Sequence, residues 1–155
     1  MDTDFDRLYR AHYSGLVAFG VSMCGDRDVA RSLAQDTIRA YENRDDVLTH
    51  PAPLAWLRRV MHNMTVDHLR RTGAEHRAVT KVSARSSQLV DAVTDPTTTW
   101  FELVRSLTPN QRAMATLFYG EGLSVATIAE TLAISEGTVK STLSKARKRM
   151  RGTQP

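Results

Sequence analysis

Apolar residues in the first half of the chain lie three and four positions apart, the pattern of helices that bury one face. This spacing predicts a helix over residues 4–23. Asp26 is a suitable N-cap for a second helix over residues 27–43, and Pro53 suits the first turn of a third helix that reaches about Arg71. No segment alternates apolar and polar residues as a half-buried strand does, so we predict an all-α fold.

The predicted third helix has two different faces. Its inner face is expected to comprise Leu54, Leu57, Val60 or Met61, Met64 and His68 or Leu69. The opposite face carries Trp56, Arg59, Asn63, Asp67 and Arg70. The second face mixes an aromatic ring, an amide and charges, so it is available for contacts outside the core.

The last third of the chain contains clear helix start and stop signals. Apolar residues at helical spacing over residues 100–107 predict one helix. The segment Thr108-Pro109-Asn110-Gln111 has the form of a capping box with proline at the first helical position. The helix that begins there should end at Gly120-Glu121-Gly122.

Two further helices, each opened by a capping serine, are predicted over residues 124–132 and 135–150. Their spacing is that of a helix-turn-helix, with the small Ala129 where the helices approach and the apolar Ile134 in the turn. Val139, Leu143, Ala146 and Met150 form the expected buried stripe of the last helix.

The other side of the last helix is polar and basic. It carries the candidate DNA contacts Glu136, Gly137, Thr138, Lys140, Ser141, Ser144, Lys145, Arg147, Lys148 and Arg149. Side chains at the start of such a helix can reach base edges in the major groove, and basic residues further along suit phosphates. The alternative is a helical hairpin with a solubilising basic tail.

The charge distribution favours the DNA interpretation. The net charge is +4, with 10 basic and 10 acidic residues in 1–73, 3 of each in 74–98, and 8 basic against 4 acidic in 99–155. The whole excess therefore lies in the last third. The segment from Gly137 to Arg151 alone has six Lys or Arg and no acid.

Residues 73–97 lack a sustained period and are rich in Ser, Thr, Ala and charge, so we predict a flexible linker there. This divides the chain into a helical domain of three to four helices over residues 1–72, the linker, a helix-turn-helix domain over 98–151 and a tail over 152–155. One cysteine, Cys24, excludes an internal disulfide and is expected to be a buried structural thiol.

Several function classes are disfavoured. No apolar run approaches the ~20 residues of a membrane span, and the charged start does not resemble a signal peptide, so we expect a cytoplasmic protein without membrane insertion. Neither the histidines nor the single cysteine has metal-site spacing, so no metal is predicted. We find no nucleophile–base set and no phosphate loop, so we predict neither an enzyme nor a cofactor nor a small-molecule substrate.

Specific segments resemble the extracytoplasmic-function sigma factors of bacterial RNA polymerase. In the last third these are Leu107-Thr108-Pro109-Asn110-Gln111-Arg112, Tyr119-Gly120-Glu121-Gly122-Leu123-Ser124, Ile128-Ala129, Gly137-Thr138-Val139-Lys140-Ser141 and Ala146-Arg147. In the first half they are Leu33-Ala34-Gln35-Asp36-Thr37, Trp56-Leu57, Asn63, Asp67 and Leu69-Arg70-Arg71. The resemblance covers nearly everything except the linker.

The resemblance implies a non-enzymatic factor that binds core RNA polymerase and directs promoter-specific transcription initiation. It implies that the last helix reads the −35 element, and that the second sigma domain recognises and melts the −10 element through Trp56, Arg59, Asn63, Asp67 and Arg70. The family also places a pocket for exposed bases at the 43–53 loop and the start of the third helix. Polymerase contacts are expected at Leu33, Gln35 and Asp36, and an anti-sigma factor is an expected partner.

An ordinary helix-turn-helix regulator with a ligand-sensing or dimerising first domain is the alternative. That class usually binds two half-sites as a dimer, and the sequence offers neither a heptad seam nor an apolar ligand pocket. Co-purification with core polymerase would separate the two functions.

Overall fold

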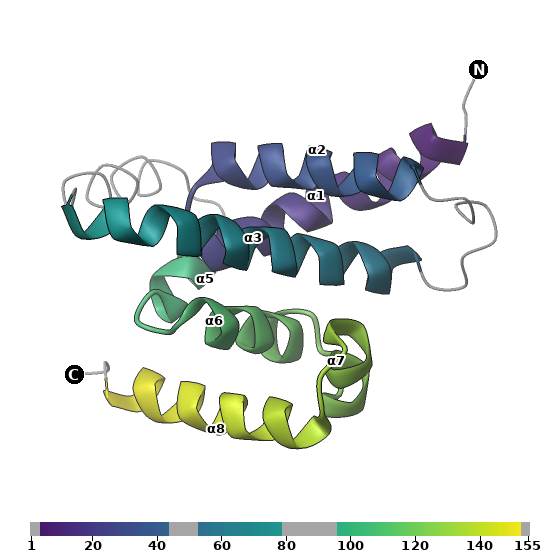
Figure 1. Cartoon of the computed structure of the whole chain (residues 1–155). Helices are drawn as coiled ribbons and strands as arrows, with labels where there is room; N and C mark the ends of the chain where they lie inside the picture. Colours follow the sequence, from purple (N-terminus) through teal and green to yellow (C-terminus); the bar gives the residue numbers. More distant parts are fainter. Residues whose placement is uncertain (1–3, 44–52, 79–95, 153–155) are drawn as a thin grey trace.

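A computed structural model describes residues 4–43, 53–78 and 96–152, and every regular element in these ranges is helical. The first module consists of α1 (Asp4–Cys24), α2 (Arg27–Glu42) and α3 (Pro53–Ala78). The second module consists of α5 (Pro96–Val104), α6 (Pro109–Ala115), the π-helical turn η1 (Thr116–Gly120), α7 (Val125–Leu132) and α8 (Glu136–Gly152). Figure 1 shows the modules stacked, with α6 and α7 between α3 and α8.

The first module forms as its sequence predicts. Asp26 caps α2 by accepting hydrogen bonds from the backbone N–H groups of Asp28 and Val29, at 2.9 and 3.1 Å. The α2 stripe, which includes Leu33, Ile38 and Tyr41, is buried against α1 and α3. These three helices therefore bury one shared core, as amphipathic helices of this length must.

The third helix is longer than its predicted end near Arg71. It continues to Ala78, through residues 73–78 that we assigned to the linker. Leu57 and Met61 lie fully buried on its inner face, which settles the choice between Val60 and Met61. The rest of the predicted linker up to residue 95, the loop 44–52 and the end of the tail lie outside the described residues.

The second module confirms the capping signals. The Thr108 hydroxyl accepts from the Gln111 N–H, and the Gln111 side chain accepts from the Thr108 N–H, completing the capping box. Ser124 and Ser135 accept from the backbone N–H groups three residues ahead, at 3.1 Å each. The sequence did not predict η1, a single π turn at the end of α6 of the kind that often marks functional segments.

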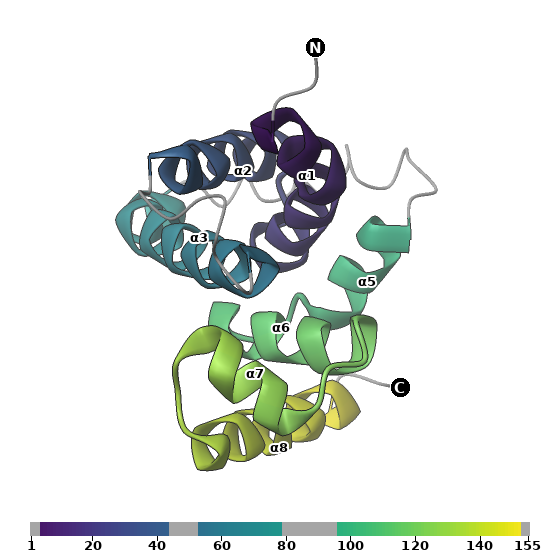
Figure 2. The same ribbon diagram turned by 90° about the vertical axis from the view of Figure 1, so that its right-hand side faces the viewer.

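The turn of the helix-turn-helix is tight because Ala133 adopts the left-handed conformation, with φ of 57°. This lets the Ile134 N–H donate to the Ala129 carbonyl at 3.0 Å. Ala129 belongs to the core cluster and Ile134 packs against it, as predicted for the close-approach residue and the turn plug. The arrangement fixes α8 across α6 and α7 (Figure 2).

The two modules pack directly against each other. Helix α3 contacts α6 and α7, and α1 contacts α5 and α6. One cluster of buried side chains contains members of both modules, among them Phe19 and Leu57 from the first and Met114, Leu117 and Ile128 from the second. The hydrophobic core is therefore continuous across the module boundary.

Candidate nucleic-acid interface

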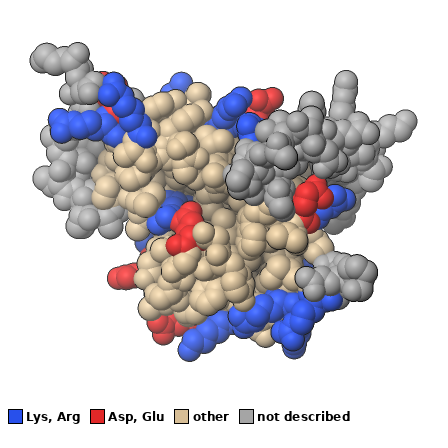
Figure 3. All heavy atoms as spheres, turned by 180° about the vertical axis from the view of Figure 1, so that it is seen from behind, with Lys and Arg blue, Asp and Glu red and all other residues tan. Residues whose placement is uncertain are grey.

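Helix α8 separates a buried stripe from an exposed basic face. Val139, Leu143 and Ala146 are buried as predicted, and Met150 packs partly against the second cluster. The exposed residues are Glu136, Gly137, Thr138, Lys140, Ser141, Lys145, Lys148 and Arg149, with Ser144 and Arg147 half-buried. Figure 3 shows Lys and Arg side chains gathered along the edge of the molecule where α8 lies, away from the first module.

Two arginines of this face are tethered by their own module. Arg147 Nη1 donates to the Tyr119 hydroxyl at 3.1 Å, and Arg149 Nη1 donates to the Ser106 carbonyl at 3.4 Å. Tyr119 is one of the exposed large hydrophobic residues, and it lies on η1. The π turn thus places an aromatic ring beside the basic face, a position that the sequence pattern did not reveal.

The candidate −10 residues of α3 differ from one another in exposure and in contacts. Trp56 packs edge-to-face against Tyr41, with ring centroids 5.3 Å apart, so in this structure it serves packing. Arg59 is half-buried and bonded to the second module. Asn63, Asp67 and Arg70 are exposed, and Asp67 forms an ion pair with Arg71 at 3.1 Å.

The candidate polymerase-binding residues of α2 divide in the same way. Gln35 and Asp36 are exposed, on the side of α2 opposite its buried stripe, and Asp36 pairs loosely with Arg39 at 3.8 Å. Leu33 is only 9% exposed and belongs to the core cluster, so in this structure it packs inside the first module, and its contact with polymerase stays a prediction. Leu33 faces inward because it lies on the same stripe as Ile38.

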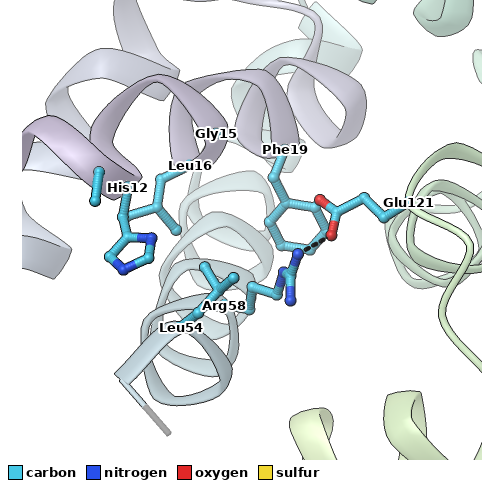
Figure 4. A pocket seen from close by; sticks show the side chains of 8 residues that line it. His12, Gly15, Leu16, Phe19, Leu54, Arg58 and Glu121 are labelled. Carbon is cyan, nitrogen blue, oxygen red and sulfur yellow. Dashed lines mark hydrogen bonds and ion pairs between the residues drawn. The ribbon is translucent and has the colours of Figure 1, made fainter.

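The sequence did not reveal the polar contacts between the two modules, which we call the seam. They are made by Arg58, Arg59 and His62 of α3 and by Arg112 of α6. Arg58 forms an ion pair with Glu121, at the edge of a small pocket of about 120 Å³ whose floor includes Leu16 and Phe19 (Figure 4). Each seam residue is a common surface type at an outward helical position. Nothing in the sequence distinguishes it from a solvated side chain.

His62 lies half-buried in the seam. Its Nε2 is 3.1 Å from the Asn110 side-chain oxygen of α6, and its Nδ1 is 3.3 Å from that of Asn63. Burial lowers the pKa of His62 below its ordinary value of 6.5, against the opposing effect of these two hydrogen bonds. Burial, with the nearby Arg58 charge, likewise lowers the pKa of His12 in the adjoining pocket.

Cys24 lies at the end of α1, where its Sγ donates to the Asp26 carbonyl at 3.4 Å. Burial raises the pKa of this thiol to about 11. This agrees with the predicted structural role. No helix in the described part of the chain is long and apolar enough to cross a membrane.

Two helical modules with a basic helix-turn-helix define a DNA-binding protein, and the comparisons with known proteins specify its class. Residues 8–75 match the family Sigma-70 region 2, and residues 100–150 match the family Sigma-70, region 4. The sigma-70 region 2 match covers the first module. It therefore excludes the ligand-sensing or dimerising domain of an ordinary regulator.

Individual relatives narrow the class further. The chain is 30% identical to the ECF RNA polymerase sigma factor SigM of Mycobacterium tuberculosis, over 94% of this chain and 74% of that protein. It is 29% identical to the RNA polymerase sigma-E factor of Streptomyces avermitilis, over 96% and 83% of the two chains. The fold matches the sigma factor RpoE of Bartonella quintana, solved with the anti-sigma factor NepR, with a TM-score of 0.68, 24% identity and coverage of 96% and 95%.

The chain therefore belongs to the extracytoplasmic-function RNA polymerase sigma factors. It acts in promoter-specific transcription initiation by RNA polymerase, within a family of initiation factors rather than enzymes.

Proposed function

We propose that α8 reads the −35 element, that the outer face of α3 recognises and melts the −10 element, and that α2 binds core polymerase. The observation that carries the proposal is the exposed basic face of α8, which stands clear of the first module (Figure 3). Lys140 and Ser141 near its start suit base edges, while Arg147 and Arg149 further along suit phosphates.

The proposed −10 surface consists of Asn63, Asp67 and Arg70, extended by Arg59 and Trp56 when these are released from their present contacts. Melting exposes unstacked bases, which need hydrogen-bonding partners and stacking platforms. Asn63 supports this role because it is exposed and carries both a donor and an acceptor. The proposed polymerase contact is formed by Gln35 and Asp36, which are the exposed members of the predicted set.

We infer a cytoplasmic protein whose partners are core RNA polymerase, promoter DNA and an anti-sigma factor. Cytoplasmic action follows from the location of bacterial RNA polymerase. The solved relative with a bound anti-sigma factor supports the third partner, since the same fold presents a binding surface there.

Run-off transcription with core polymerase tests the −35 assignment. The templates are a matched promoter and copies with single changes in the −35 element. Lys140→Ala should lower activity on the matched template about tenfold and reduce discrimination at one −35 position, since one good base contact is worth about 1–3 kcal/mol. Arg105→Ala is the matched control, because Arg105 is an exposed cation of the same module that pairs with Glu102 instead.

Equal losses on matched and altered templates would contradict base reading by Lys140. Equal effects of Lys140→Ala and Arg105→Ala would contradict a role for the α8 face.

A further inference from the structure

An arginine of the first module caps a helix of the second. Arg59 Nε donates to the Thr131 carbonyl at 2.8 Å, and its Nη2 donates to the Glu130 carbonyl at 2.9 Å. These carbonyls lie in the last turn of α7, which ends at Leu132. Carbonyls of a last turn lack the usual intrahelical partners, and a cation there also interacts favourably with the helix dipole.

An arginine of the second module caps a helix of the first. Arg112 Nη1 donates to the Met23 carbonyl in the last turn of α1, and its Nη2 donates to the Arg105 carbonyl at 3.2 Å. The guanidinium lies 5.4 Å from the centroid of the Phe101 ring, within the range of a cation–π contact. A Cβ at Gly25 would overlap that same ring, so α5 is pressed onto the end of α1.

Further contacts lie between these two caps. They are the Arg58–Glu121 ion pair and the His62–Asn110 hydrogen bond, over the hydrophobic core that both modules share. Arg112 is drawn into the seam far enough that its Nε is buried without a hydrogen-bond partner among the described residues. Burial also lowers its pKa. A half-desolvated guanidinium of this kind belongs to a packed interface rather than to a solvated surface.

We propose that the free chain rests in a closed state, held by these reciprocal arginine caps, and that the seam must open before the protein assembles productively with polymerase on a promoter. The closed contact rests on the structure alone. The need for opening rests also on the proposed function.

The need for opening follows from the geometry. Helices α3 and α8 lie on opposite sides of α6 and α7, and the basic face of α8 points away from the first module (Figures 1 and 3). While its guanidinium is bonded to the end of α7, Arg59 cannot also bond to a strand of the −10 element. The closed chain therefore presents the proposed −35 surface but withholds part of the proposed −10 surface.

Small-angle X-ray scattering of the free full-length protein tests the closed contact. The wild type should have the compact radius of gyration of the structure, and Arg59→Ala with Arg112→Ala should enlarge it. Arg31→Ala is the control, since this exposed cation of α2 forms its ion pair within the described residues with Asp28 of the same helix, at 3.6 Å, and its loss should leave the protein compact. Extended wild-type protein would overturn the proposal.

Affinity for core polymerase tests the consequence. Arg112→Ala leaves every proposed DNA and polymerase contact in place. It should bind core about tenfold more tightly, because the closed fraction reduces apparent affinity and one charge-assisted hydrogen bond shifts such an equilibrium about that much. Circular dichroism checks that the variant is folded. Arg112→Lys keeps the charge but loses the second hydrogen-bonding nitrogen of the guanidinium, so its increase in affinity for core should be smaller.

A folded, expanded Arg112→Ala protein with unchanged core affinity would overturn the regulatory consequence. Joining His62→Cys to Asn110→Cys with a reducible bismaleimide linker, in a Cys24→Ser chain, should abolish run-off transcription until the linker is reduced. Full activity of the linked protein would also overturn the proposal. Absence of transcription by unmodified wild-type holoenzyme would instead contradict the proposed function and leave the scattering result standing.

Discussion

The outer face of α8 and the outer face of α3 are built from similar side chains, yet the fold treats them differently. On α8, Lys140, Lys145 and Lys148 are exposed to solvent. On α3, Arg58, Arg59 and His62 contact the second module. Both faces are polar outward sides of amphipathic helices, and only the packing of the modules makes one open and the other partly covered.

The contrast shows that residue type determines what a surface can bind, while the packing of the modules determines when that surface is accessible. The α8 face depends on charge, so the contacts with DNA that we propose for it should weaken steeply with salt. The seam combines an apolar core with hydrogen bonds that are partly shielded from water, so it should respond much less to ionic strength. The two surfaces can therefore be perturbed separately.

The largest effect is expected at Asn63, which lies at the boundary between the covered and exposed parts of α3. Asn63→Ala removes an exposed side chain that we propose bonds to an unstacked base. Open-complex formation should fall about tenfold, the effect of losing one good base contact, while association with core polymerase is retained. Permanganate reactivity of −10 thymines measures it, with Asp28→Ala on α2 as the control. Unchanged reactivity would remove Asn63 from the −10 surface.

A smaller effect is expected on α2, which stays exposed in the closed state. Gln35→Ala combined with Asp36→Lys should lower affinity for core polymerase about fivefold, because it deletes one polar contact and reverses one charge at an interface. Surface plasmon resonance measures it, and Asp28→Lys is a matched charge reversal on the same helix. A thermal melt checks that both proteins remain folded. Equal losses for the two would indicate a general charge effect instead of a specific contact.

The smallest effect concerns pH. Burial in the seam lowers the pKa of His62 from its ordinary value of 6.5, so the closed state favours the neutral ring. The open state takes up the proton first as the pH falls, and the closed state loses stability from about pH 6.5 downward.

Scattering between pH 7.5 and 5.5 should therefore show roughly a twofold rise in the expanded fraction. His62→Gln should flatten most of this change, whereas His68→Gln, further along α3, should leave it intact. A more compact protein at low pH would contradict the expected direction of this pH effect.

Short-range sequence signals predicted most of the fold. The Thr108–Gln111 box, the serine caps and the Asp26 cap depend on residues only two or three positions apart, so the sequence revealed each of them. The end of α3 could not be read in this way, because residues 73–78 contain Gly73 and lack a clear apolar period, yet they continue the helix.

The site was predictable only where it depends on one helix. The exposed and buried sides of α8 follow directly from its periodicity. The seam joins residues far apart in the chain, such as Arg59 with Thr131 and Arg112 with Met23, and no periodicity within one helix encodes such a pair. Family resemblance marks the whole segment around Leu33, and only the structure shows that Leu33 is buried while Gln35 and Asp36 are exposed.

The half-buried thiol at the end of α1 has a consequence for the chemical reactivity of the chain. With its pKa raised to about 11, Cys24 is thiolate in roughly one molecule in ten thousand at neutral pH, and thiolate is the form that peroxides attack. Attack by peroxides on this thiol should therefore be slow at neutral pH.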